Sequence, residues 1–158
     1  MNTTRFLNRL KKQGTIRLIE PSRELQEAYI KKSSSYLISA KLLVDNDRLE
    51  ESVSMAYYSM YYLLQALLFR IGIKCENHTA SIILLKEIFG FENSQILFAK
   101  KERIDKQYYV DFTVTKDEVI ETISVAEEFT AMLLDFLARL QNDHAAEFRL
   151  NAERLMRG

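Results

Sequence analysis

An arginine and a pair of tyrosines lie close together in one charged segment of the chain. Arg103 precedes Tyr108 by five positions, and Tyr109 follows directly. A guanidinium binds a phosphate through paired hydrogen bonds, while a phenol can donate a hydrogen bond or stack on a base. This arrangement predicts a phosphate-binding site. The alternative is structural, with Arg103 in a salt bridge to Asp105 or Asp111 and the two tyrosines closing a helical bundle.

Proton transfer near neutral pH would need a group with a suitable pKa beside Arg103. Histidine has a reference pKa of about 6.5, whereas tyrosine, at about 10, stays protonated and is a poor base. The chain has two histidines, His78 and His144, and neither is near Arg103 in the sequence. The sequence therefore predicts that no group suited to acid–base catalysis lies beside Arg103.

His78 stands where a turn meets the next helix. We expect it either to contact a ligand or to bond a neighbouring backbone group as a structural residue at a helix start. The other histidine, His144, lies in a charged tail, and Cys75 is the only cysteine. The sequence thus offers no intrachain disulfide and no recognisable metal site, and we expect no metal and no cofactor.

A short basic cluster surrounds Arg103. Its members are Lys100, Lys101, Arg103 and Lys106, interleaved with Glu102 and Asp105. The chain carries 22 basic and 22 acidic residues, so its net charge is zero and affinity for nucleic acid must come from such a local patch. Lys106 is a candidate phosphate contact, and the alternative is a solvated helix face. Glycine-rich phosphate loops and the His-Glu-x-x-His motif are absent from the sequence.

Apolar residues at helical spacing predict an all-α fold. The expected helices cover residues 3–12, 22–46, 48–71, 78–89, 93–105 and 116–140. Between them we expect an extended arm (15–20), a turn (72–77) and an irregular connector (108–114). One proline and four glycines leave the long helices almost uninterrupted, so the fold should be an up-and-down bundle of four to five main helices.

Several residues mark where these helices begin and end. Ser22 is a predicted N-cap, and segments 47–50 and 115–118 have the form of a capping box. Gly90 occupies a C-terminal stop position. The tight turn at Asn46 and Asp47 predicts that the two helices on either side of it form the dominant antiparallel pair.

The chain divides into three parts on this basis. Residues 1–21 form a short N-terminal helix and an arm, and residues 22–142 form the helical bundle. The charged segment 143–158 is expected to extend the last helix or to fray.

The helix predicted over residues 48–71 is apolar almost all round. A tyrosine and methionine stripe on it is expected to belong to the core or to an interface. A helix of this kind is buried on more than one side, and self-association is one way for a small bundle to cover the second side. The sequence therefore predicts a homodimer.

The order of several short motifs resembles the HEPN superfamily of small helical bundles, and within it the prokaryotic, archaeal-type UPF0332 subgroup. The motifs are Ala56-Tyr57-Tyr58, Leu67-Leu68 followed by Gly72-Ile73, His78, and the segment from Arg103 to Tyr109. The resemblance covers residues from about Glu24 to Leu140. In active members, an arginine and a histidine a few residues later cleave RNA without a metal across a dimer cleft. Here Tyr108 stands in the histidine position.

The resemblance implies two alternative functions. In the first, the protein is a non-catalytic module that binds a nucleotide, or a small nucleotidyltransferase with which it forms a toxin–antitoxin-like pair. Its ligand contacts would be Arg103, Lys106, Tyr108, Tyr109 and His78. In the second, it is a divergent metal-independent ribonuclease toxin that uses Arg103 with Tyr108.

The sequence contains no apolar run long enough to cross a membrane, and its N-terminus lacks the apolar core of a signal peptide. Together with the single cysteine, these features predict a soluble protein of the reducing cytoplasm without a membrane partner.

Overall fold

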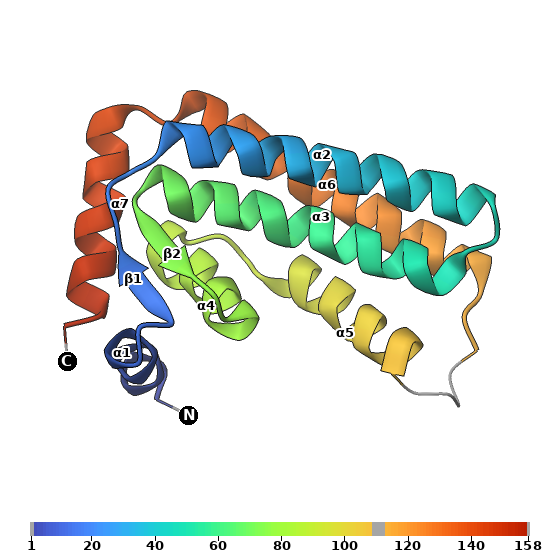
Figure 1. Ribbon diagram of the computed structural model, residues 1–158, viewed down its shortest axis with the longest axis horizontal. Coiled ribbons are helices and arrows are strands. Elements are labelled where there is room, and N and C mark those ends of the chain that lie inside the picture. The colour runs from blue at the N-terminus through green and yellow to red at the C-terminus, as the bar shows by residue number, and fades with distance from the viewer. Residues whose placement is uncertain (1, 109–112, 158) are drawn as a thin grey trace.

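The computed structural model describes residues 2–108 and 113–157 and forms a helical bundle (Figure 1). The elements are α1 (Thr3–Lys12), β1 (Ile16–Leu18), α2 (Arg23–Asp45), α3 (Leu49–Arg70), β2 (Ile73–Cys75), α4 (His78–Phe89), α5 (Ser94–Tyr108), α6 (Lys116–Arg139) and α7 (Asn142–Leu155). Three long helices, α2, α3 and α6, run alongside one another, and α5 lies along α3. The remaining elements, α1, β1, β2, α4 and α7, gather at one end. The predicted all-α fold is confirmed.

Helices α2 and α3 form the dominant antiparallel pair of the bundle, as predicted. Ser22 caps α2, because its Oγ accepts a hydrogen bond from the Leu25 amide at 3.1 Å. The predicted capping box at residues 47–50 is wrong. Asp47 adopts a left-handed φ of 59° to make the tight turn, which an aspartate tolerates. Arg48 is then the N-cap of α3, without a side-chain cap hydrogen bond.

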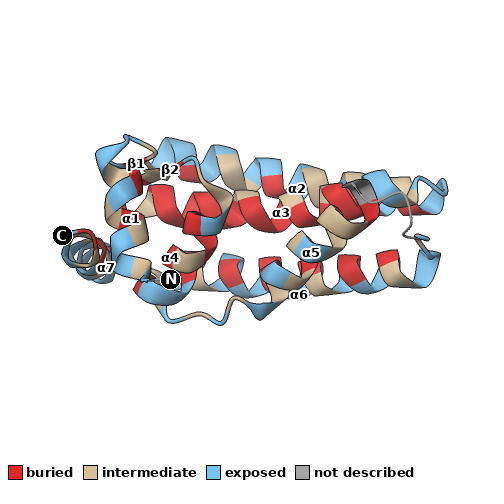
Figure 2. Ribbon diagram, turned by 90° about the horizontal axis from the view of Figure 1, so that it is seen from below, coloured by how far each residue is buried: buried red, intermediate tan, exposed pale blue. Residues whose placement is uncertain are grey.

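The apolar helix α3 lies at the centre of the molecule, and Figure 2 shows it buried along most of its length. Helices α2, α5 and α6 pack on different sides of it, and β2 covers part of its end. Both apolar sides of α3 are therefore covered within one chain. The argument for self-association that rested on this helix loses its basis, and the homodimer stays a prediction.

A two-stranded antiparallel ribbon joins the N-terminal arm to the segment after α3. Ile16 pairs with Cys75 and Leu18 with Ile73, and Ile16 and Ile73 are fully buried. The extended arm is confirmed, whereas the segment 72–77 is a strand over Ile73–Cys75 and not only a turn. The strand forms because the arm returns to this point and pairs with the segment's backbone, a partner that local spacing does not reveal.

Helix α6 begins at the predicted cap, since the Thr115 Oγ1 accepts a hydrogen bond from the Glu118 amide at 3.3 Å. The C-terminal segment does not extend α6. Leu140 has an extended backbone, and α7 starts after Gln141 and turns to pack on α4. The turn is stable because Phe148 of α7 packs against Phe89 and Phe136, with ring centroids 5.0 and 5.9 Å away.

Among the described residues, no helix combines the length and apolar composition that crossing a membrane would require.

Candidate functional site

The predicted residue Arg103 lies on α5 and faces the tyrosines of α3. Its guanidinium carbon lies 4.9 Å from the ring centroid of Tyr58 and 5.6 Å from that of Tyr57. These distances are typical of cation–π contacts. Helix α5 presents Arg103 in this way because its apolar residues Ile96 and Ala99 are buried against the bundle, which fixes the helix alongside α3.

His78 joins the same group from the first turn of α4. Its ring stacks on Tyr61 at a centroid distance of 3.8 Å with the planes 10° apart, and its Nδ1 lies 2.8 Å from the Tyr57 hydroxyl. The expected helix start is confirmed, and the cap is the neighbouring Asn77, whose Oδ1 accepts from the Ala80 amide. The imidazole thus pairs with a side chain, where the structural alternative expected a backbone partner.

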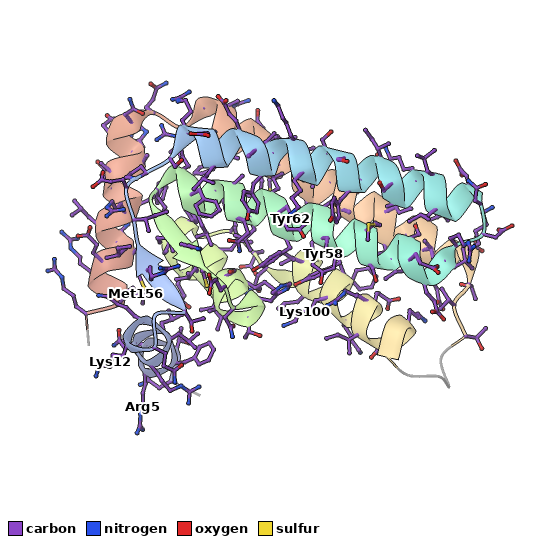
Figure 3. All side chains as sticks on the ribbon, viewed as in Figure 1. Arg5, Lys12, Tyr58, Tyr62, Lys100 and Met156 are labelled. Atoms are coloured by element: carbon purple, nitrogen blue, oxygen red, sulfur yellow. The ribbon has the colours of Figure 1, made fainter. Side chains whose placement is uncertain are left out.

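Lys100 completes the site one turn before Arg103. Its Nζ donates a hydrogen bond to the Thr79 Oγ1 at 3.0 Å, which ties α5 to the start of α4. Figure 3 shows Lys100 on α5 together with Tyr58 and Tyr62 on α3. We call the six residues Tyr57, Tyr58, Tyr61, His78, Lys100 and Arg103 the tyrosine–arginine cluster.

The electrostatics of the cluster favour neutral histidine and protonated phenols. Burial, helped by the nearby Arg103 and Lys100, lowers the pKa of His78 below its usual value. Burial raises the pKa of Tyr57 far above its ordinary value, and it raises the pKa of Tyr61 to about 12. The phenols are therefore hydrogen-bond donors and not bases near neutral pH. With Tyr57 as the donor to Nδ1, the neutral imidazole carries its proton on Nε2.

A strip of tyrosine rings continues the cluster along α3 towards α2. Tyr58 and Tyr62 stack at 5.6 Å, and Tyr36 of α2 meets Tyr62 edge-on at 4.9 Å. Lys32 lies 4.4 Å above the Tyr62 ring. The partly exposed ring faces are flanked by a cation on each side, an arrangement suited to stacked bases and their phosphates.

The predicted contact Lys106 lies elsewhere, on the side of α5 that faces α6. Its Nζ is 2.6 Å from the Glu118 Oε2, and its side chain is only 8% exposed. The hydrogen bond with Glu118 raises the pKa of Lys106 and lowers that of Glu118. This geometry supports a structural link between α5 and α6, so that ligand binding by Lys106 would require the pair to open.

The two predicted tyrosines are described only in part. Tyr108 is the last residue of α5, which corrects the expectation that the irregular connector begins there. The helix continues three residues past its predicted end at residue 105. The side chain of Tyr108 and the whole of Tyr109 lie outside the described residues, so their roles stay predictions.

Sequence reasoning missed the association of Arg103 with His78 and with the tyrosines of α3. These tyrosines were expected to belong to a core or interface stripe, and Tyr57 and Tyr61 are indeed buried. The available signal was the spacing of Tyr57 and Tyr61, which puts both rings on one helix face. Nothing in the sequence indicated that α4 and α5 would bring a histidine and an arginine to that face.

Comparison with known proteins identifies the family. The family model of the HEPN domain matches residues 26–137, and the chain belongs to this family. The matched range contains the whole tyrosine–arginine cluster and leaves out α1, β1 and α7.

A similar protein supports the subgroup as well. The chain is 38% identical over 84 residues to the UPF0332 protein PH1297 of Pyrococcus horikoshii, an archaeal protein. The match covers 52% of this chain and 54% of that protein, so the chain spans about half the length of this relative. The resemblance to the UPF0332 subgroup of HEPN proteins is confirmed.

Proposed function

We propose that this HEPN protein binds the phosphate and base of a nucleotide or an RNA strand at the tyrosine–arginine cluster, without cleaving it. The observation that carries the proposal is the position of Arg103, whose guanidinium carbon lies 4.9 Å from the Tyr58 ring centroid. Burial, together with the charge of Arg103, lowers the pKa values of His78 and Lys100. Converging cations beside tyrosine rings provide the two interactions that single-stranded nucleic acids use, phosphate pairing and base stacking.

We expect no cleavage because of the residue that occupies the family's histidine position. Tyr108 stands where active relatives are expected to have histidine, and the raised pKa values of Tyr57 and Tyr61 remove these phenols as bases. General acid–base help contributes about a hundred- to ten-thousand-fold in rate, so a site whose residue at the family position cannot provide it should cleave RNA far more slowly than active relatives.

The second candidate is a divergent metal-independent ribonuclease, and the position of His78 favours it. The sequence predicted that no group suited to acid–base catalysis lies beside Arg103, and this prediction is wrong. A neutral imidazole bonded to Tyr57 lies in the same cluster, within the electrostatic influence of Arg103. In this candidate His78, and not Tyr108, would move the proton while Arg103 neutralises the phosphate.

RNA binding and RNA cleavage by purified variants distinguish the two candidates. A fluorescent single-stranded oligoribonucleotide is incubated with protein in EDTA, and both anisotropy and product length are measured. Arg103→Ala should weaken binding about tenfold or more, because a charged hydrogen bond to phosphate is lost. The matched control is Lys101→Ala, which removes an exposed charge from the neighbouring position of α5. Equal loss in both variants would refute a specific role for the cluster.

Cleavage is the second readout of the same experiment. We expect none from the wild-type protein. Cleavage that disappears in His78→Ala and survives in Tyr108→Phe would establish the second candidate with histidine as its base. Cleavage that disappears in Tyr108→Phe and survives in His78→Ala would instead identify Tyr108 as the catalytic partner of Arg103.

The biological setting is also part of the proposal and rests on the resemblance to HEPN proteins. We propose that the protein acts with a small nucleotidyltransferase in a toxin–antitoxin-like pair. Overexpression of this chain alone should then leave growth unchanged if it only binds, and arrest growth if it cleaves RNA. Arrest that Arg103→Ala relieves would favour the ribonuclease.

A further inference from the structure

A cavity of about 420 Å³ lies at the end of the bundle away from the α2–α3 turn. Its walls come from the first turns of α2, the end of α3 and the junction between α6 and α7. It shares no residue with the tyrosine–arginine cluster. The volume falls in the range of small-molecule binding sites.

Two arginines from different helices converge on this cavity. Arg23 is the first residue of α2 and Arg70 the last of α3. Within residues 2–108 and 113–157, neither guanidinium has a carboxylate within 4 Å, and none of the lining residues is acidic. Burial and the neighbouring charge of Arg23 lower the pKa of Arg70. Two cations held together without an anion form a site that an anionic ligand would stabilise.

Arg70 is held in position by its own hydrogen bonds. Its Nη2 donates to the Asn142 side-chain oxygen at 2.7 Å and to the Leu140 carbonyl at 3.4 Å. These partners belong to the junction between α6 and α7, so the tertiary fold fixes the guanidinium before a ligand arrives. Preorganisation of this kind lowers the entropic cost of binding.

Gln26 is a second, independent observation that points to a ligand, because its buried side-chain oxygen Oε1 has no hydrogen-bond donor among the described residues. Its side chain is nine-tenths buried and lines the cavity. A buried amide oxygen without a donor is unfavourable, and a donor supplied from the cavity would satisfy it once the amide rotates. A hydroxyl group next to the anionic group of a ligand would be such a donor.

The rest of the lining is aliphatic except for Gln141, which adds a second amide. Ile30, Leu134 and Leu137 contribute aliphatic side chains from α2 and α6. Helices α2 and α7 begin at the cavity, and α3 and α6 end there, so the helix dipoles largely cancel. The two arginines therefore make the electrostatic potential in the cavity positive. Two arginines, two amides and an aliphatic patch together fit an organic phosphate better than a bare ion.

We propose that this cavity is a second binding site, for a small phosphate monoester that carries a hydroxyl group and an apolar or heterocyclic portion. The phosphate would bind between Arg23 and Arg70, the hydroxyl would donate to Gln26, and the remainder would lie against the aliphatic wall. A nucleoside monophosphate is the chemical class that meets these requirements. The site is independent of the proposed function of the tyrosine–arginine cluster.

Isothermal titration of the full chain with three probes tests this site. The probes are adenosine 5′-monophosphate, inorganic phosphate and adenosine. We expect saturable binding of the monophosphate, weaker binding of phosphate and the weakest binding of adenosine. Arg23→Gln should weaken monophosphate binding about tenfold or more, since it removes one charged phosphate contact. Gln26→Leu keeps the volume and removes the amide, so it should weaken the monophosphate more than phosphate.

Two variants keep the result interpretable. Arg139→Gln removes an exposed arginine near the same end of α6 and should leave binding unchanged. Arg103→Ala disables the tyrosine–arginine cluster and should leave a full equivalent of monophosphate bound here. Arg23 is exposed, so its replacement should not unfold the chain, which thermal melting would verify.

The outcomes that overturn the proposal are distinct from failure of the proposed function. No saturable monophosphate binding at millimolar concentration, binding unchanged by Arg23→Gln, or adenosine bound as tightly as the monophosphate would each refute this cavity as a phosphate site. Binding lost in Arg103→Ala and kept in Arg23→Gln would place the ligand in the tyrosine–arginine cluster, which contradicts the second site and supports the proposed function.

Discussion

His78 is the residue whose surroundings most restrict its chemistry. It lies between the Tyr61 ring, 3.8 Å away, and the Tyr57 hydroxyl, and two cations lie near it. Protonation would place a third positive charge beside Arg103 and Lys100 in a partly buried position. The folded protein therefore holds this histidine neutral, ready to accept a proton or to stack.

This environment predicts how stability depends on pH. The pKa of His78 is lower in the folded chain than its usual value of about 6.5, so between these two pKa values the unfolded chain binds more protons. The free energy of unfolding should then be at its full value above about pH 6.5 and decrease as the pH falls below it. Urea unfolding at several pH values between about 7.5 and 5.5 measures the decrease.

His78→Gln is the comparison for this measurement. The variant has no titrating group at the position, so its stability should change less over the same range. Glu118, whose pKa is lowered, affects stability only at more acidic pH, below the usual range of a carboxyl group. An equal slope in the wild type and in His78→Gln would contradict the neutral buried histidine.

At the scale of the elements, one junction connects α7 to the strand β1, both of which lie outside the range matched by the HEPN family model. Arg149 of α7 donates from Nη1 to the carbonyls of Ile19, Ile71 and Gly72, at 2.7, 3.1 and 3.0 Å. These carbonyls lie between β1 and α2 and between α3 and β2. One side chain thus ties the C-terminal helix to the ribbon and to the central helix.

Arg149→Ala should therefore destabilise the fold. The truncation leaves partly buried carbonyls without their donor, and a loss of about 1–3 kcal/mol is expected. For a chain of this size the melting temperature should fall by roughly 2–4 °C for each kcal/mol. Arg139→Ala is the control, because this exposed arginine pairs within its own helix, with Asp135 one turn away. Similar melting temperatures for both variants would show that the junction contributes little.

Gly72 at the same junction has no room for a side chain. Its φ is +80°, and an added Cβ would collide with the Arg149 guanidinium and the Ile19 carbonyl. Gly72→Ala should cost about 1–2 kcal/mol for the left-handed backbone and a further amount for the displaced contacts. Gly14→Ala is a matched control, since Gly14 has a φ of +77° and open space around it. Thermal melting should show the larger loss for Gly72→Ala, and equal losses would argue against the close approach.

At the scale of the whole molecule, the burial of α3 changes the basis for expecting a dimer. The helix is covered by α2, α5 and α6 of the same chain, so its composition no longer requires a second copy. The prediction of a homodimer now rests on the resemblance to dimeric HEPN proteins. Large apolar side chains do remain exposed on α2, where Ile38 and Leu42 are 57% and 59% accessible.

The homodimer prediction concerns the mass of the particle in solution. Light scattering at micromolar concentration should give about twice the 18.5 kDa of one chain. The measurement is repeated after dilution, because the fraction of dimer falls once the protein concentration approaches the dissociation constant. A mass near 18.5 kDa throughout would contradict the dimer.

The sequence by itself determined the helical class, most helix bounds and the dominant α2–α3 pair. These features depend on local signals, such as apolar spacing, the Ser22 and Thr115 caps and the Gly90 stop, which act within one or two helical turns. It also singled out Arg103 and His78 as candidate site residues, because their chemical types are informative wherever they lie.

Only the tertiary structure decided which of these residues meet. His78 and Arg103 are 25 positions apart, and they converge because α4 and α5 both pack beside α3. Lys106 turns towards Glu118 of α6 for the same kind of reason, and α7 leaves the line of α6 to reach Ile19. Such contacts depend on the packing of helices far apart in sequence, and helical spacing carries no information about which partner a helix face will find.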